Sequence, residues 1–219
     1  MKKNFAMRIA ACLLVVTMLS LCMVSYTYAK YTTGIKGTSS ITMIAKWGIN
    51  LELVTDGNIY DDDKTTDDVV NCSVKNAYFA APGTHKKIAT VKLTGTPDVA
   101  YAINVVPAIK LEGWVVGDNE VYCPLVFTVG NEQFQIDDTI TTTDALIKAV
   151  GEAIETALCE GNHKAGEAIA DTAADLEISW TWAFETGNDA KDTELANKGQ
   201  AKVDVSLTIE VNQLDEYTE

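Results

Sequence analysis

Two segments near the end of the chain alternate between apolar and polar residues, and this alternation constrains the fold more than any other feature. Residues 176–185 have the sequence LEISWTWAFE, and residues 201–212 have the sequence AKVDVSLTIEVN. Successive side chains of a β-strand point to opposite faces, so a period of two predicts strands with one buried and one solvent-facing side. The predicted buried side of the first strand includes Trp180, Trp182 and Phe184. Two such strands need a second apolar layer, which the rest of the chain must supply.

Alternation elsewhere predicts further strands at short spacing. A first long strand is expected over residues 41–54, with every second side chain from Ile41 to Leu53 on one face and a bend at Gly48. The remaining candidate strands cover residues 69–80, 86–94, 99–106, 109–116 and 120–129. About seven to nine short strands separated by turns are typical of an antiparallel β-sandwich or jelly roll, so we expect an all-β fold of this kind.

Residues 144–159 have the spacing of a helix instead. Apolar side chains recur there at intervals of three and four, Thr141 or Thr143 can cap the start, and Gly161 can end the helix. We therefore expect a helical insertion at about residues 144–175 that covers an end or an edge of the sheet.

The first 29 residues have the three parts of a secretory signal peptide. A positive start, MKKNFAMR, precedes the apolar residues 9–26, and small residues then stand before a cut that would leave Lys30 first. A retained membrane anchor is the competing interpretation, because the apolar run has the length of a short membrane-spanning helix. Contact with a membrane is expected only through this leader before cleavage. Residues 30–40 are polar, so we predict a mobile N-terminal arm ahead of a single domain at 41–219.

The chain is strongly acidic, with a formal net charge of −14 at pH 7. Such a surface repels nucleic acid, so no nucleic-acid partner is expected. The mature part contains Cys72, Cys123 and Cys159. One disulfide with one free thiol and three buried thiols are both open at this point, and small core residues are the favoured interpretation.

An acidic loop at residues 55–68 raises the question of calcium. Asp56, Asp61, Asp63 and Asp67 are candidate oxygen ligands. The loop lacks the glycine and the final glutamate of an EF-hand, so a solvated charged loop is the favoured interpretation and no metal is expected.

Motifs of the common enzyme classes are absent from the sequence. We find no zinc-protease, zinc-deaminase, serine-hydrolase, phosphate-loop or dinucleotide-binding pattern, so neither an enzyme nor a cofactor is expected. Tryptophan rings can stack on sugars, which raises the question of a glycan-binding module. Trp180 and Trp182 share a face with aliphatic residues and are expected in the core. Trp114, in the segment EGWVVG, is the candidate for an exposed ring, although a core position is about equally consistent.

Several segments together carry a resemblance to a known family. They are the signal peptide with its polar arm, the strand SSITMIAKWGINLEL at residues 39–53, the turn and strand pair from Ala81 to Val105, and the motif W-x-W-x-F-E at residues 180–185. This combination resembles the TasA/camelysin family of exported proteins from Gram-positive bacteria, whose leaders are processed by the dedicated signal peptidase SipW. Camelysins have also been labelled metalloproteases, but no zinc motif is present here. The strand at 201–212 and the three mature cysteines depart from the family pattern.

The resemblance implies a jelly-roll domain that assembles into fibres of the extracellular biofilm matrix. In the family, the arm after the cleavage site pairs with the sheet of the next subunit, and here that arm would run from Lys30 to about Ile44. Its assembly residues would be Lys30, Tyr31, Ile35, Ile41 and Met43. We therefore expect a secreted, self-associating structural protein of the cell surface or matrix, with an exported ligand- or glycan-binding module as the alternative.

Overall fold

The computed structural model describes most of the chain beyond the predicted leader and arm. The described residues are Met18, 39–45, 47–55, 59–60 and 69–215. The predicted signal peptide 1–29 and the arm through residue 38 therefore lie outside the described residues, apart from Met18. The chain forms two compact units, Met1–Gly37 and Thr38–Glu219, and the second contains the β-fold. Within the described part, no helix has the length and apolar character needed to cross a membrane.

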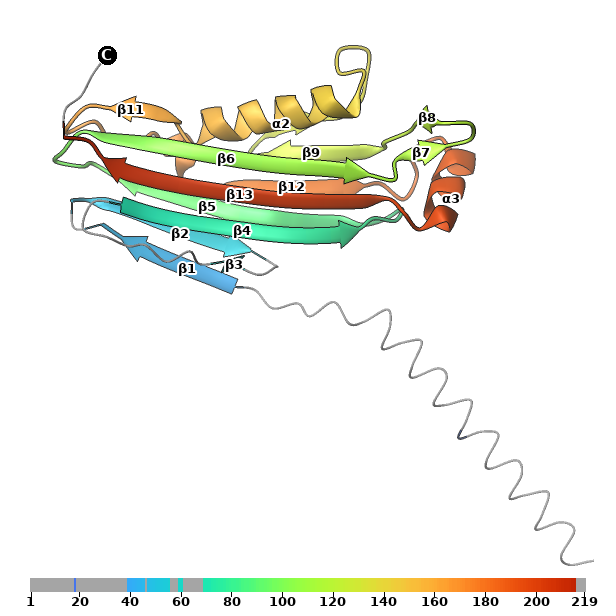
Figure 1. Ribbon diagram of the computed structural model, residues 1–219, viewed down its shortest axis with the longest axis horizontal. Helices are drawn as coiled ribbons and strands as arrows, with labels where there is room; N and C mark the ends of the chain where they lie inside the picture. Colours follow the sequence, from blue (N-terminus) through green and yellow to red (C-terminus); the bar gives the residue numbers. More distant parts are fainter. Residues whose placement is uncertain (1–17, 19–38, 46, 56–58, 61–68, 216–219) are drawn as a thin grey trace, which may run out of the picture. The chain divides into compact units, whose positions relative to one another are not determined.

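Two antiparallel sheets pack face to face and enclose an apolar core (Figure 1). The first sheet has six strands in the order β1-β2-β5-β12-β9-β10. Their bounds are Ser39–Ile44 (β1), Ile49–Thr55 (β2), His85–Gly95 (β5), Leu176–Trp182 (β12), Leu125–Val129 (β9) and Glu132–Phe134 (β10). This architecture confirms the predicted all-β sandwich.

The second sheet has five strands in the order β11-β6-β13-β4-β3. Their bounds are Gly161–His163 (β11), Tyr101–Glu112 (β6), Lys202–Gln213 (β13), Val69–Phe79 (β4) and Ile59–Tyr60 (β3). The remaining elements are the ribbon strands Val115–Val116 (β7) and Glu120–Val121 (β8), and the helices Thr143–Ala157 (α2), Asp171–Ala173 (η1, a 3-10 turn) and Asp189–Lys198 (α3). Figure 1 shows α2 along one side of the sandwich, beside β6 and β9, and α3 at one end. The predicted helical insertion is therefore confirmed.

The two alternating segments that predicted strands form β12 and β13. The inward side chains of β13 are at most 4% exposed: Val203, Val205, Leu207, Ile209 and Val211. Those of β12 are at most 5% exposed: Leu176, Ile178, Trp180 and Trp182. Burying each large apolar side chain contributes about 1.5–3 kcal/mol to folding. The predicted buried faces of both strands are confirmed, with one exception.

Phe184 does not join this buried face, so that part of the prediction is wrong. β12 ends at Trp182, and the Phe184 side chain is 77% exposed. The Gly83 N–H donates a hydrogen bond to the Trp182 carbonyl at 2.9 Å, which ends the strand against a turn. The Phe184 ring lies over Gly83, where an added Cβ would come within 3.4 Å of ring atom Cδ2. Alternation stops predicting orientation once the chain leaves the sheet.

Residues 41–54 form a hairpin of β1 and β2, and the prediction of one bent strand is wrong. The strands pair with Ile41 opposite Leu53. Gly48 lies in the turn with φ of 100°, and its N–H donates to the Ala45 carbonyl at 3.1 Å. Opposed residues are both odd-numbered or both even-numbered, so the alternation continues across the reversal and the sequence pattern does not reveal it.

The predicted strands 99–106 and 109–116 form largely one continuous strand, β6. Pro107 lies inside β6, opposite Leu207 of β13. On its other side β6 faces α2, because a Cβ added to Gly151 would lie 3.5 Å from the Pro107 ring. A proline is tolerated in a strand that faces no partner strand on one side, since no ladder hydrogen bond is lost there.

The helix α2 begins one residue away from either predicted cap. Its N-cap is Thr142, where Thr141 or Thr143 was expected. The Thr142 hydroxyl accepts a hydrogen bond from the Ala145 N–H at 3.1 Å, which satisfies one of the free donors of the first turn.

The helix α2 ends on a cysteine in the left-handed conformation, and Gly161 is not the terminator. Cys159 has φ of 58°. Its N–H donates to the Thr156 carbonyl at 3.1 Å, and the Glu160 N–H donates to the Glu155 carbonyl at 3.0 Å. These are the two closing hydrogen bonds of a Schellman motif, in which glycine usually holds the position of Cys159. Gly161 starts β11 instead.

Candidate functional site

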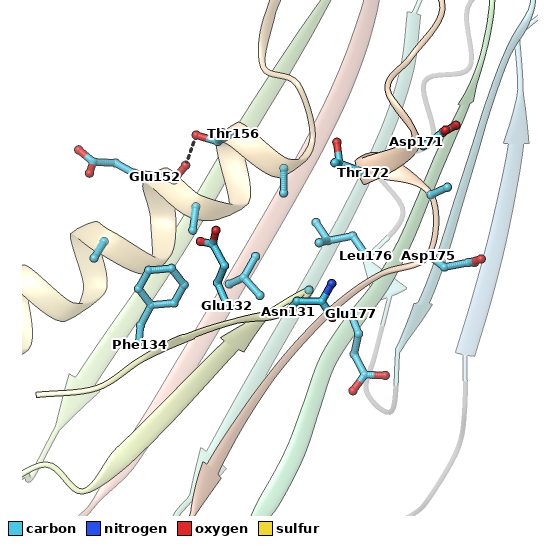
Figure 2. Close-up of a pocket in the computed structure, with 16 residues that line it drawn as sticks. Asn131, Glu132, Phe134, Glu152, Thr156, Asp171, Thr172, Asp175, Leu176 and Glu177 are labelled. Atoms are coloured by element: carbon cyan, nitrogen blue, oxygen red, sulfur yellow. Dashed lines mark hydrogen bonds between the residues drawn. The ribbon is translucent and has the colours of Figure 1, made fainter.

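A groove opens between the second half of α2, the turn joining β9 to β10, and residues 171–177 (Figure 2). Its volume is about 1010 Å³. Three segments that are distant in the sequence form its walls. One of them contains β10, the end strand of the first sheet, so the groove lies at that edge of the sheet. Grooves of this size are where proteins commonly bind ligands or segments of partners.

Small and apolar side chains form the base of the groove. Ala149, Ala153 and Ala157 recur every four residues along α2 and therefore share one helix face. Their side chains end at Cβ, so the helix leaves a recess where longer residues would fill the space. Val129 and Leu176 continue the apolar surface on the sheet side.

Acidic side chains surround this base. The lining carboxylates are Glu132, Glu152, Asp171, Asp175 and Glu177, and no lysine, arginine or histidine lines the groove. Glu152 pairs with Lys148 at 3.5 Å, and Asp175 pairs with Lys92 at 3.7 Å. Both are solvent-exposed pairs that contribute only about 0–1 kcal/mol.

Glu132 occupies a position where the strand pattern places core side chains. It lies opposite Val129, and Phe134 of the same strand lies opposite Phe127. Directly opposed residues share a face of the sheet, and both partners on β9 are buried at 4% and 1% exposure. Figure 2 shows the Glu132 carboxylate directed toward α2 across the groove. Within the described residues this carboxylate has no ion-pair partner, so it is available to a positive group that enters.

A second polar cluster surrounds His163 at the start of β6. The His163 ring stacks on Tyr101, with ring centres 4.8 Å apart and planes 15° apart. Its Nε2 lies 2.7 Å from the Cys159 carbonyl, and its Nδ1 lies 3.2 Å from a Glu167 carboxylate oxygen. The Tyr101 hydroxyl donates to the Glu167 carbonyl at 3.1 Å. These contacts hold β11 against β6.

Burial raises the pKa of two buried groups, Tyr101 and Cys123. Burial, together with the nearby Glu167 carboxylate, raises the pKa of Tyr101 to about 12. Burial also raises the pKa of the Cys123 thiol to about 12. A thiol held protonated in the core is a poor nucleophile.

Trp114 is buried, so of the two positions that the sequence left open, the core position holds and the exposed ring does not. It is 2% exposed, and its ring centre lies 5.4 Å from that of Trp182. The indole N–H donates to the Lys202 carbonyl at 3.0 Å. The ring therefore seals the end of the core between β7 and β13 and offers no surface to a sugar. Trp180 and Trp182 are fully buried, as predicted.

The predicted calcium ligands fall outside the described residues, so their geometry is not part of the structure. They are Asp56, Asp61, Asp63 and Asp67. Across the described ranges, no group of three His, Cys, Asp or Glu side chains is placed to hold a metal ion.

The predicted assembly residues divide between the two parts of the chain. Lys30, Tyr31 and Ile35 lie outside the described residues. Ile41 and Met43 belong to β1, which pairs with the chain's own β2. Within one copy of the protein, the end of the predicted arm is thus already part of a sheet.

Cys72, Cys123 and Cys159 form no disulfide bond within the described part of the chain. Cys72 and Cys123 are buried in the core, and Cys159 is half-buried after α2. The structure therefore favours small core residues over the disulfide alternative for the first two.

The fold and groove together define an antiparallel β-sandwich with an acidic surface groove. Comparison with protein-family models, with curated proteins and with solved structures finds no match to this chain. The resemblance to the TasA/camelysin family therefore depends on the sequence motifs alone.

The sequence motifs did not point to the groove. Its one sequence signal is the spacing of Ala149, Ala153 and Ala157 along the helix. That spacing becomes informative only when the facing hairpin is known, because alanines on a helix often pack closely against a neighbour instead of leaving a recess.

Proposed function

We propose that the protein is an exported structural subunit that assembles into surface or matrix fibres, by adding a segment of one copy to a sheet edge of the next. The signal-peptide pattern and the family resemblance support export and self-association. The structural observation that carries the proposal is that the described sandwich keeps unpaired strand edges in both sheets.

Unpaired edges include those of β1, β10 and β4. β1 and β10 are the end strands of the six-stranded sheet, so each has one side without a partner strand among the described residues. β3 pairs with β4 only at Ser73 and Val74, and no other described strand pairs with residues 75–79 on that side. Exposed strand edges add strands from other chains, and proteins that stay monomeric usually cover or shorten them.

A side-chain contact lies where the pairing of β2 with β5 ends, close to β4. The hydroxyl of Thr55, the last residue of β2, donates to the Ile88 carbonyl of β5 at 2.8 Å. The Asn76 amide of β4 lies 3.5 Å from the Thr55 hydroxyl oxygen. Beyond this point no described strand pairs with residues 85–87 on the β2 side of β5. Among the described residues, no strand pairs with the open side of β4 or of β5 next to this contact, so an incoming segment could add to either strand there.

The glycan-binding alternative loses its structural basis. Its candidate platform was Trp114, and that ring is enclosed by the core. Among the described residues, the exposed large aromatic side chains are Phe79 and Phe184, which lack the polar handle and broad face that make tryptophan effective on sugars.

Electron microscopy and sedimentation of the mature protein, residues 30–219, test the proposal. We expect filaments or large oligomers, and we expect deletion of residues 30–38 to reduce them strongly. Both proteins are compared with and without calcium, because the acidic surface makes self-association sensitive to divalent cations. If both stay monomeric at high concentration under all these conditions, the proposal is wrong.

A disulfide lock separates two modes of strand exchange. Thr42 and Glu52 lie opposite each other on β1 and β2, so Thr42→Cys with Glu52→Cys can fix β1 in its own sheet. If assembly uses only residues 30–38, the locked protein still forms filaments. If β1 itself must leave and pair with a neighbour, filaments form only after reduction. The single variants Thr42→Cys and Glu52→Cys are the matched controls.

A further inference from the structure

We propose that the groove beneath α2 is the acceptor for residues 30–38 of a second copy. The inference rests on the proposed function and names the site at which one subunit receives the next. The segment has the sequence KYTTGIKGT, which contains two lysines and no acidic residue. It is thus a basic stretch in a chain whose formal net charge is −14.

Charge complementarity selects this groove among the unpaired edges. Five carboxylates and no basic side chain line it. Among the described residues, Glu132, Asp171 and Glu177 form no salt bridge. The edge of β4 and β5 instead carries Lys75, Lys86 and Lys87, which would repel the lysines of the segment. Repulsion between these lysines disfavours binding of the segment at the β4 and β5 edge, and so favours the groove as its binding site.

The shape of the groove also fits an extended segment. In a strand, Tyr31 and Ile35 would share one face while Lys30 and Lys36 share the opposite face. The alanine face of α2 and Leu176 offer an apolar base for the first pair, and the surrounding carboxylates receive the second. β10 is the end strand of its sheet and borders the groove, so it can also supply backbone hydrogen bonds.

The order of strands favours a second copy over the chain's own arm. The segment leads into Ser39 at the start of β1, and β1 and β10 are the two end strands of the six-stranded sheet. Crossing that sheet spans about 24 Å at the usual strand spacing. Nine extended residues reach at most about 30 Å, so few would remain to bind. Donor and acceptor at opposite edges make a head-to-tail contact, which extends into a fibre instead of closing as a dimer.

Peptide binding tests the acceptor directly. Residues 38–219 contain all the described strands and form a compact unit, so this piece can be titrated with a fluorescent peptide of residues 30–38. We expect Glu132→Lys with Glu177→Lys to weaken binding at least about tenfold. The peptide with both lysines changed to glutamate should lose a similar factor. Asp118→Lys with Glu185→Lys, two exposed acids outside the groove, is the matched control and should change affinity less than about twofold.

Filament formation by residues 30–219 gives the second readout. The groove variant should form no filaments, the Lys30→Glu with Lys36→Glu variant should form none, and a protein carrying both changes should recover them. Circular dichroism verifies that each variant is folded. If the variant with Glu132→Lys and Glu177→Lys does not fold, the variant with Glu132→Gln and Glu177→Gln replaces it. Filaments that persist in the folded groove variants but vanish on deletion of residues 30–38 would overturn this acceptor and leave the proposed function standing. Absence of filaments from the unaltered protein would count against the proposed function itself.

Discussion

The indole N–H of Trp182 donates a hydrogen bond to the buried carboxylate of Asp192, with 3.1 Å between Nε1 and Oδ1. The same carboxylate accepts hydrogen bonds from the hydroxyls of Tyr122, at 2.9 Å, and of Thr186. Asp192 is 4% exposed and belongs to α3, whereas Trp182 ends β12. This carboxylate therefore fastens the polar insert 186–200 onto the end of the sandwich.

Replacing Asp192 with alanine is expected to lower the free energy of unfolding by about 2–3 kcal/mol, because donors from three side chains lose their acceptor in a buried site. Asp192→Asn keeps one acceptor oxygen and should cost less. Urea unfolding monitored by tryptophan fluorescence measures both. A loss below about 0.5 kcal/mol for the alanine variant would show that other contacts hold the insert.

Trp114→Ala should destabilise the protein by about 3–5 kcal/mol, because it removes a large buried ring from the end of the core. Trp114→Phe keeps much of the volume but loses the hydrogen bond to the Lys202 carbonyl, so it should cost less. Thermal unfolding followed by circular dichroism compares the two. A variant with unchanged melting temperature would contradict the buried position.

Cys159→Gly should leave stability unchanged or raise it by about 0.5–1 kcal/mol, because glycine adopts positive φ without a steric cost. The gain is limited by the loss of the packing that the half-buried side chain contributes. Cys159→Val should be clearly destabilising, since a branched Cβ tolerates the left-handed conformation poorly. We expect the glycine variant to have a melting temperature at least as high as that of the unaltered protein, and the valine variant to have the lowest. A valine variant as stable as the glycine variant would show that the α2 terminus is relaxed.

Tyr101 should make the protein less stable as the pH rises from about 10 toward 12. Its pKa is raised from 10.0 to about 12, so the folded protein holds this proton over a range in which the unfolded chain releases it. The contribution of the protonated Tyr101 to stability is fully present below pH 10, the pKa in the unfolded chain. It decreases as the pH rises toward about 12, the pKa in the folded protein. Tyr101→Phe removes this titration, so its stability should approach that of the unaltered protein as the pH increases. Unfolding by urea at pH 8 and pH 11 measures the change, and a constant difference between the two proteins would contradict it.

Iodoacetamide should modify Cys159 in the folded protein while Cys72 and Cys123 react only after unfolding. The last two side chains are at most 6% exposed, whereas Cys159 is half-buried. The raised pKa of Cys123 further lowers its thiolate population. Mass spectrometry of the labelled peptides at pH 8 tests the order. Equal labelling of all three thiols would show that the core opens on the labelling timescale.

Period-two alternation predicted the buried faces of β12 and β13 because each strand lies between its neighbours with one side on the core. The same rule did not reveal the β1–β2 hairpin, because Ile41 and its partner Leu53 are both odd-numbered and the pattern continues through the turn. It also could not place Trp114, which lies where a long strand gives way to a short ribbon. Local spacing does not describe such ends, where packing between distant segments decides burial.

The groove was beyond prediction from local patterns for a related reason. Its walls come from residues 129–134, 149–157 and 171–177, and their proximity depends on how α2 lies against the sheet. Glu132 illustrates the difficulty. In sequence it is one of 31 acidic residues, and only its position opposite Val129 shows that it lies beside the groove, on the same face of the sheet as that buried side chain.

The placement of β1 and β10 at opposite margins of one sheet has a consequence for growth. A polymer built through these two edges has two different ends. One end presents an unoccupied acidic groove, and the other presents an unbound basic segment, residues 30–38. A free peptide with the sequence of this segment would then block one end while leaving the other able to capture subunits. Amounts far below one peptide per subunit should be enough to shorten the polymers, because each polymer has a single end of that kind.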